Sequence, residues 1–453
     1  MLQVKSSLTK SGITIKTLNK KYFVRYNNRY WREYPQKMKE FFLDNITFIS
    51  TFHLPLFFDD NKITFNTADP LVKPWVYEVM MKYIPYSADV DNTSASQLFL
   101  KFANMEFDFD NLNMKLPESN FDPDEKALIN FTFGKESLVT LGICDEIGLN
   151  NDLIYFESPT TSPIETKLKR KYSALFSKKL NKNIIEVTGN TYDLCDATNF
   201  GRPQTEWGYG IELTEYAIQC LPIIDAEKMR FIIFGNEKSC DNSYISREGY
   251  KSNPVYEQSS EWTNEISNMM KIITGGRTSV FSLVEPINEL AVIKILHNRY
   301  SELGRFQFSC FPDNHPSSLD TTWCHMCTKC ARIYVFMKAI GVDVKTIGFR
   351  ENLFEKKYNT IFPIFNGTTR HGIPYDDSGL NRDELIFAFY LAYKNGETGS
   401  AIDLFKKRYL DEAKQREDEL HKEFFGIFDS KTIPHDIRDK VVSIFKEELN
   451  GSI

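Results

Sequence analysis

Apolar and polar positions alternate along the first 122 residues in the short runs that are typical of β-strands. Four such runs occur, at residues 13–18, 22–26, 45–50 and 62–67. The polar residues 19–21 between the first two runs predict a hairpin turn. The polar stretch 116–125 contains two prolines and predicts a linker. The pattern therefore favours a strand-rich α+β region over residues 1–122, in which nothing indicates a chemical role.

From residue 127 the pattern changes to apolar runs separated by amphipathic segments. Val139, Ile143 and Ile147 repeat every four residues and predict a helix, and residues 165–180 predict a second one. Such an alternation predicts an α/β fold over residues 123–345, with a parallel sheet covered by helices on both faces. In these sheets ligands bind at the carboxyl ends of the strands. The strands are expected at residues 127–133, 153–156, 184–187 and 231–234.

The last part of the chain, residues 346–453, is predicted to be helical. Its highly charged segment 401–425 predicts one solvated helix that packs by a single face. The apolar stripe of that helix comprises Ile402, Phe405, Tyr409 and Ala413. A length of 453 residues is compatible with two to three domains, as the three regions suggest.

The overall composition is that of a soluble globular protein, with 42% hydrophobic and 26% charged residues. This excludes a disordered chain, a collagen-like fibre and a disulfide-stapled miniprotein. Lys and Arg total 55 against 61 Asp and Glu, and the net charge of −6 gives no general attraction to nucleic acids or anionic membranes. No apolar run reaches the length of a membrane span or a secretory signal, so a cytoplasmic protein is expected. The sequence leaves open whether the protein forms a homo-oligomer.

The loop that follows the first strand of the α/β region has the composition of an anion site. Gly134 allows backbone N–H groups to approach a ligand, and Lys135 adds a positive charge. Ser137 can donate a hydroxyl at the start of the next helix. The spacing is not that of the nucleoside-triphosphate P-loop. The alternative is an ordinary strand–turn–helix connection with a surface lysine.

Half of the eight cysteines fall in one short segment, as Cys310, Cys324, Cys327 and Cys330. Two successive C-x-x-C steps and one more distant cysteine predict a tetrahedral thiolate site for Zn²⁺ or, as an alternative, an iron–sulfur cluster. Four thiolates leave no open position on a zinc ion, which would make its role structural. His315 and His325 are expected to be bystanders. The remaining cysteines, Cys144, Cys195, Cys220 and Cys240, are expected to be small core residues.

The loop resembles the S-G-G-x-D-S loop of the PP-loop ATP pyrophosphatases. The matching positions are Thr132, Phe133, Gly134, Lys135, Glu136 and Ser137. Phe133 and Glu136 depart from the pattern. Phe133 is unsuited to a turn that needs a positive φ, and Glu136 is one methylene longer than the aspartate it replaces.

The order of the loop and the cysteine segment resembles one family, 7-cyano-7-deazaguanine synthase and its relatives, over roughly residues 125–345. Further similarities lie at residues 231–237, at residues 282–290 with Lys294, at Ser309 next to Cys310, and at Arg332. The thirteen residues between Cys310 and Cys324 are more than is usual in that family. The flanking regions have no counterpart in it.

The resemblance implies an ATP-dependent, AMP-forming ligase. In that family a carboxylate attacks the α-phosphate of ATP, and ammonia then displaces AMP. In the synthase itself, a second activation dehydrates the amide to a nitrile. The substrate implied is a small-molecule carboxylate, with a 7-deazaguanine as one candidate. Since no glutaminase segment is recognisable, the ammonia would be free or come from a separate partner protein.

The resemblance also implies the site residues. The catalytic residues would be Lys135, Ser137 and Glu237, and Glu136 would reach the phosphates through Mg²⁺. Phe156 and Glu157 would contact the adenosine, and Arg202 is a further candidate for an anion. The ATP site would comprise Thr132, Phe133, Gly134, Lys135, Glu136, Ser137, Phe156, Gly235 and Asn236. The structural Zn²⁺ would bind Cys310, Cys324, Cys327 and Cys330.

Two other functions are compatible with the same motifs. One is a PP-loop tRNA-modifying enzyme, similar to a thiolase, with an iron–sulfur cluster on the cysteines. The acidic net charge argues against this function. The other is a non-catalytic relative in which Phe133 blocks the loop and the fold serves as a binding module.

Overall fold

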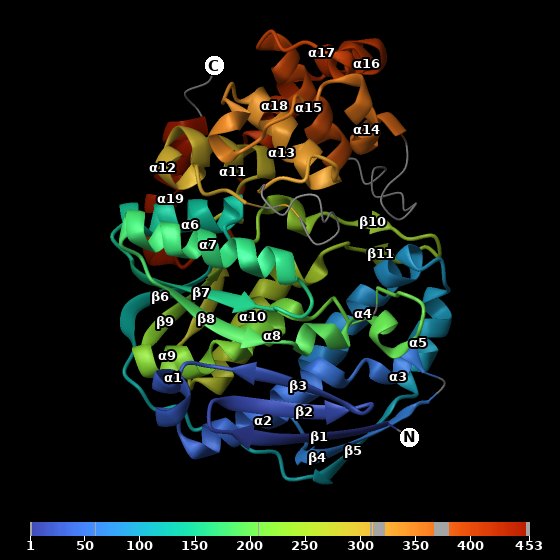
Figure 1. Ribbon diagram of the computed structural model, residues 1–453, viewed down its shortest axis with the longest axis vertical. Helices are drawn as coiled ribbons and strands as arrows, with labels where there is room; N and C mark the ends of the chain where they lie inside the picture. Colours follow the sequence, from blue (N-terminus) through green and yellow to red (C-terminus); the bar gives the residue numbers. More distant parts are fainter. Residues whose placement is uncertain are drawn as a thin grey trace.

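The computed structural model describes residues 2–58, 60–206, 208–308, 310, 322–366 and 380–449. Ser309 and His315 of the cysteine segment lie outside these residues. Within them, a ten-stranded sheet has the order β12-β9-β6-β7-β8-β3-β2-β1-β4-β5. The N-terminal strands lie at one end of the molecule and the C-terminal helices at the other (Figure 1). The predicted α/β class, with a large and mostly parallel sheet and a helical C-terminal region, is confirmed.

Five parallel strands form one half of the sheet, and the strands predicted for the middle of the chain are among them. Their bounds are β6 (Asp124–Asn130), β7 (Asn150–Glu157), β8 (Ile184–Gly189), β9 (Met229–Phe234) and β12 (Ser279–Ser282). The chain runs from β6 to β7 and β8 on one side, and then crosses to β9 and β12 on the other. The carboxyl ends of β6 and β9 therefore form a topological switch point, where such sheets bind ligands.

Successive residues of these strands pack against opposite layers of helices, as the side-chain period of a strand requires. Ile129 and Ile233 belong to one core, and Leu128 and Ile232 belong to the other. The first layer comprises α6 (Lys135–Glu146), α7 (Pro163–Leu180), α11 (Glu289–Asn298) and α12 (Ser301–Gly304). The second comprises α8 (Glu212–Gln219), α9 (Leu221–Glu227) and α10 (Ser260–Ile273).

The N-terminal strands extend the same sheet. Strand β3 (Lys20–Arg25) pairs antiparallel with β8 through Val24 and Gly189, so the sheet continues across the predicted boundary near residue 122. The other strands of this half are β1 (Leu2–Thr9), β2 (Gly12–Thr17), β4 (Lys62–Ala68) and β5 (Glu106–Asn111). Helices α1 (Asn28–Glu33), α2 (Gln36–Thr51), α3 (Leu54–Phe57), α4 (Lys73–Val90) and α5 (Ala95–Ala103) share a hydrophobic core with these strands. Strand β10 (Tyr244–Ile245) pairs separately with β11 (Lys251–Ser252).

The strand predicted at residues 45–50 is wrong, because these residues lie in helix α2. Every residue from Asp44 to Thr51 is buried. A helix surrounded by protein has no polar face, so its apolar residues lose the spacing by which a helix is recognised. The β-branched residues of this segment also favour a strand when they are considered locally.

The C-terminal region is helical as predicted, but the single helix predicted at residues 401–425 is wrong. The structure has α16 (Ser400–Arg408), α17 (Leu410–Gln415) and α18 (Glu417–Phe424), with the chain leaving helical geometry at Tyr409 and Arg416. The other helices are α13 (Thr328–Ala339), α14 (Pro363–Asn366), α15 (Leu380–Lys394) and α19 (His435–Leu449). In the part of the chain that the structure describes, every helix is too short or too polar to cross a bilayer.

Candidate functional site

A cavity of about 450 Å³ lies beside the switch point, where the loop after β6 meets residues that follow β9. Its volume falls in the range of small-molecule sites in proteins. Helix α7, the start of α11 and the start of α13 complete its walls. Of the predicted site residues, Thr132, Gly134, Lys135, Glu136, Glu237 and Cys310 line it.

The loop turns directly into helix α6, so the unpaired N–H groups of the helix begin at the cavity. Gly134 is the N-cap residue. The Thr132 hydroxyl accepts a hydrogen bond from the Gly134 N–H at 3.3 Å, and Ser137 Oγ donates to the Gly134 carbonyl at 3.0 Å. Ser137 is buried and is not among the described residues that line the cavity. Its hydroxyl therefore stabilises the loop through the Gly134 carbonyl.

Phe133 has a left-handed backbone conformation at the position where the S-G-G-x-D-S pattern has its first glycine. Its φ is 61°, in the left-handed region that bulky residues seldom occupy. The side chain is fully buried and packs edge-on against Phe131, with ring centroids 4.8 Å apart, and also contacts Tyr172 and Phe176. Phe133 therefore keeps the shape of the turn, and its side chain points into the core rather than into the cavity.

Lys135 lies in a buried network of opposite charges. Its ammonium contacts the Glu136 carboxylate and is 2.9 Å from Glu289 Oε1. Burial disfavours the charged amine, but the two carboxylates outweigh this effect and raise the pKa of Lys135. Lys135 is therefore a positively charged side chain fixed by its ion pairs at the start of helix α6. The helix dipole also favours a bound anion at this place.

Glu237, which follows β9, lines the same cavity as Lys135. Burial, together with the charge of Glu289, raises the pKa of Glu237 to about 7. Its carboxylate accepts hydrogen bonds from the N–H of Ser239, at 2.7 Å, and from the Ser239 hydroxyl. A carboxyl group that titrates near neutral pH in a cavity is a common feature of functional sites.

The two residues before Glu237 have structural roles. A side chain at Gly235 would place its Cβ 2.7 Å from the Cβ of Glu136, so the glycine allows the two loops to approach. Asn236 Nδ2 donates to the Thr263 hydroxyl at 3.0 Å, which turns its side chain towards α10. Neither residue is among the described residues that line the cavity.

The residues predicted to contact adenosine or a second anion also lie elsewhere. Phe156 stacks on Tyr216, with ring centroids 4.3 Å apart, beside a separate and much smaller cavity. Glu157 is buried and pairs with Arg170 Nη2 at 2.7 Å. Arg202 is exposed and lies over the ring of Phe58.

The structure adds four charged residues to the cavity that the motif comparison did not assign. They are Lys169 on α7, Glu289 at the start of α11, and Lys329 and Arg332 on α13. Lys169 pairs with Glu165 at 2.5 Å. Lys329 stays accessible although protein surrounds it, and burial together with the charge of Lys135 lowers its pKa to about 8. The order of residues carried one signal for three of them. Glu289 and Arg332 lie at positions similar to the 7-cyano-7-deazaguanine synthase family, and Lys329 lies in the cysteine segment.

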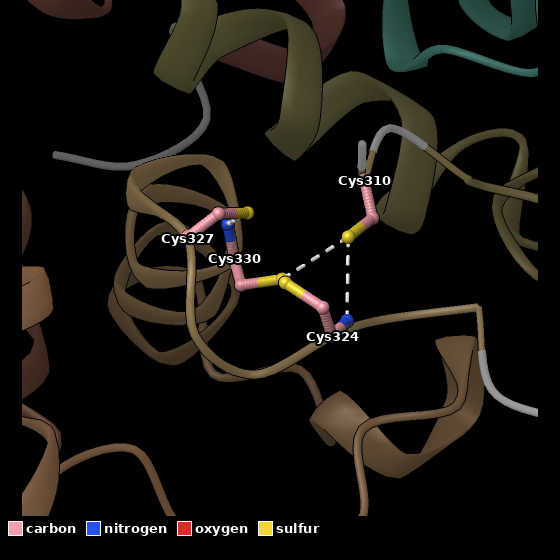
Figure 2. A group of neighbouring side chains, drawn as sticks. All are labelled: Cys310, Cys324, Cys327 and Cys330. Atoms are coloured by element: carbon pink, nitrogen blue, oxygen red, sulfur yellow. Dashed lines mark hydrogen bonds between the residues drawn. The ribbon is translucent and has the colours of Figure 1, made fainter. Parts of the chain in front are cut away.

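The four predicted cysteines lie together, and one of them, Cys310, lines the cavity. The sulfur atoms of Cys310, Cys324, Cys327 and Cys330 all lie within 4.8 Å of one another and could hold a metal ion. Figure 2 shows three of them on one loop and helix turn, with Cys310 approaching from a separate segment.

Sulfur spacings in the cluster fit a single tetrahedral ion. The Sγ atom of Cys330 is 3.6 Å from that of Cys324 and 3.7 Å from that of Cys310. A zinc–sulfur bond of about 2.3 Å places tetrahedral sulfurs about 3.8 Å apart. A cluster of several irons would need a wider set of thiolates, so the geometry favours a structural zinc ion.

Backbone groups already orient the thiols. The N–H of Cys324 donates to Cys310 Sγ at 3.2 Å, and the N–H of Cys330 donates to Cys327 Sγ at 3.4 Å. His325 has a φ of 60° in the turn between two of the cysteines, and its Nε2 accepts a hydrogen bond from Arg350. His325 is therefore a turn residue beside the cluster and not one of its ligands.

No known family model matches this chain, and no curated protein is significantly similar to it in sequence. The cavity and the cysteine cluster are therefore the features from which a function can be inferred.

Proposed function

We propose that this chain is an ATP-dependent, AMP-forming enzyme of the carbon–nitrogen ligase type, which adenylates the carboxylate of a small molecule for amide or nitrile formation. The loop after β6 carries the proposal. It lies at the switch point of the sheet, keeps a left-handed turn at Phe133, and delivers Gly134 and Lys135 to the cavity at the start of a helix. This arrangement suits a pyrophosphate group.

The proposed reaction activates a poor electrophile. A carboxylate oxygen attacks the α-phosphorus of ATP, the bond to the bridging oxygen breaks, and pyrophosphate leaves. Ammonia then attacks the acyl carbon, AMP leaves with the electron pair of the broken C–O bond, and the new amide nitrogen loses a proton to water. A nitrile would require activation of the amide oxygen by a second ATP before that oxygen leaves. In this chain, Lys135 and the first N–H groups of α6 would neutralise the charge that develops on the leaving pyrophosphate.

Other cavity residues suit the remaining tasks. Glu136 and Glu237 carry carboxylates into the cavity, and oxygen ligands of this kind are those that Mg²⁺ prefers. Lys169 and Lys329 offer positive charge on the other walls, where an acidic substrate such as a carboxylated 7-deazaguanine would find a partner. A Cys₄ zinc site has no open position, so its role in the proposal is structural.

Carboxylate-dependent exchange of labelled pyrophosphate into ATP tests the adenylation step directly. The wild-type protein is assayed with Mg²⁺-ATP and 7-carboxy-7-deazaguanine, and then with ammonia, while AMP and the mass of the product are followed. Lys135→Met should weaken ATP binding about 30-fold or more, since it removes a buried charge partner. Lys179→Met is the matched control, because Lys179 pairs with Glu302 on the protein surface.

The outcomes separate the candidate functions. AMP together with the amide or nitrile mass supports the proposal and identifies the substrate. Pyrophosphate exchange without a deazaguanine product retains adenylation and assigns another carboxylate. Release of ADP and phosphate alone would contradict the proposal. Absence of ATP binding would leave the binding-module alternative, and a coloured protein that contains iron would favour the tRNA-modifying one.

A further inference from the structure

Five charged side chains form a continuous series of ion pairs from the loop after β6 to the C-terminal helices. Lys135 contacts Glu136 and lies 2.9 Å from Glu289. Glu289 also contacts Arg332, whose Nη2 is 2.9 Å from Glu384 Oε2. The series begins at α6 and passes through α11 and α13 to α15, which are far apart in the sequence.

Glu384, the last member, is more deeply buried than the others. Its exposed fraction is 1%, against 7% for Lys135 and 8% for Glu289. It also accepts a hydrogen bond from the N–H of Leu290 at 2.8 Å, in the first turn of α11. Glu384 therefore holds the helix on which Glu289 lies and, independently, the arginine that contacts Glu289. A buried carboxylate is retained only when partners of this kind compensate its desolvation.

We infer that Glu384 is a positioning residue of the cavity, which fixes the place and the reactivity of Lys135 through Arg332 and Glu289. Through Glu384 on α15, the C-terminal helical region thereby contributes to the arrangement of the site. The consequence for nucleotide binding rests on the proposed function, whereas the link between Glu384 and Lys135 does not.

The expected direction follows from the sharing of charges. Arg332 divides its positive charge between Glu289 and Glu384. If Glu384 becomes neutral, Arg332 is drawn to Glu289 alone, and Glu289 then stabilises the Lys135 ammonium less. The Lys135 amine is unprotonated more often and reacts faster with an electrophile. Burial raises the pKa of Glu384 to about 8, so the comparison belongs at pH 9, where the wild-type carboxylate is charged.

The first test labels lysine amines by reductive methylation with formaldehyde at pH 9 and quantifies the Lys135 peptide by mass spectrometry. In Glu384→Gln, Lys135 should react about three- to tenfold faster relative to the exposed Lys179 of the same sample. Glu397→Gln is the matched control. Glu397 pairs with Lys338 of the same helix α13 at 2.9 Å, but Lys338 is not among the described residues that line the cavity.

Two results would overturn the inference. One is an unchanged Lys135 rate in folded Glu384→Gln, and the other is an equal increase in Glu384→Gln and Glu397→Gln, which would indicate general loosening. If Glu384→Gln does not fold, Glu384→Asp replaces it. The shorter side chain withdraws the carboxylate from Arg332, which is then drawn to Glu289, so the Lys135 rate should also rise.

The second test is a double-mutant cycle on Mg²⁺-ATP binding, also carried out at pH 9, where the wild-type Glu384 carboxylate is charged. Glu384→Gln should weaken binding about three- to tenfold in the wild-type background and have no effect in a Lys135→Met background, since it acts through that lysine. If Lys135 labelling responds but the wild type binds no ATP, the proposed function fails and the positioning role stands. If Lys135→Met weakens binding while Glu384→Gln changes neither readout, the positioning role fails and the proposed function stands.

Discussion

The cysteine cluster and the loop after β6 border the same cavity, but they are built in different ways. The cluster consists of four like ligands, and three of them fall within seven residues of sequence, from Cys324 to Cys330. The loop contains two departures from the pattern it resembles, and the charges around Lys135 come from distant segments such as the start of α11. A metal site can thus be specified by local spacing, whereas an anion site depends on charges that only the tertiary structure assembles.

Cys327→Ser tests whether the cysteine cluster binds a structural metal ion, and we expect it to have the largest effect of these variants. A structural zinc contributes folding free energy directly, so loss of a thiolate ligand should release the metal and lower the free energy of unfolding by about 3–5 kcal/mol or more. Metal content by mass spectrometry and urea unfolding would measure both effects. Cys195→Ser should keep the metal, since Cys195 lies outside the cluster and donates to the Gly208 carbonyl. Full metal content and stability in Cys327→Ser would show that the site is misassigned.

Phe133 tests whether the loop keeps its shape through its backbone or its side chain. Phe133→Ala should lower the free energy of unfolding by about 3–5 kcal/mol, because a large buried aromatic ring is lost. Phe133→Gly should lose the same ring but relieve the left-handed strain, and so be about 1 kcal/mol more stable than the alanine variant. Urea unfolding of the pair gives the difference. An alanine variant at least as stable as the glycine variant would argue against strain at this position.

The pH dependence of stability tests the charge network around the loop. The pKa of Glu237 is about 7 in the folded protein against an ordinary value of 4.5, so the folded state holds the proton more tightly. The contribution of Glu237 to the stability should therefore fall as the pH rises from about 4.5 to 7 and level off above that. Glu237→Gln should reduce the loss between pH 5 and pH 8 by about 1–3 kcal/mol.

Urea unfolding at both pH values measures this effect. Glu261→Gln serves as the control, because Glu261 is an exposed residue that pairs with Lys82 on the surface. Coinciding pH profiles for the wild type and Glu237→Gln would mean that this carboxyl group is not perturbed by its surroundings.

Phe156 provides the smallest and most discriminating effect. The resemblance implies a contact with adenosine, whereas the ring stacks on Tyr216 outside the main cavity. Phe156→Leu should change ATP affinity less than about twofold and lower stability by about 1 kcal/mol through loss of the aromatic pair. Titration calorimetry measures the affinity. A tenfold loss in a folded variant would place the adenosine beside β7 after all.

Prediction from the sequence was most successful where short-range patterns decide the structure. The strands near residues 127, 153, 184 and 231 correspond to β6, β7, β8 and β9, because a run of apolar residues between helices suits a buried parallel strand. It was wrong at residues 45–50, where burial of the second half of α2, from Asp44 to Thr51, removes the polar face that identifies a helix.

Predictions for the site also succeeded where the local order of residues decides the structure and failed where distant partners decide it. Gly134, Lys135 and Glu136 reach the cavity because a strand followed at once by a helix must present the loop at the carboxyl end of the sheet. Asn236 and Phe156 turn away from it, because the direction of a side chain at a strand end depends on partners such as Thr263 and Tyr216. No local pattern could reveal that Glu384, nearly 250 residues after Lys135, belongs to the same series of ion pairs.

The α/β class, the strand–loop–helix unit at residues 127–147 and the grouping of the four cysteines could all be predicted from the order of the residues. These features depend on periodicity and ligand spacing, which neighbouring residues set. Three features became visible in the folded chain alone: the N-terminal strands join the same sheet, Phe133 turns into the core, and α15 contributes Glu384 to the network around Lys135. Contacts between distant segments are fixed by packing and charge pairing, which have no signature in the local order of residues.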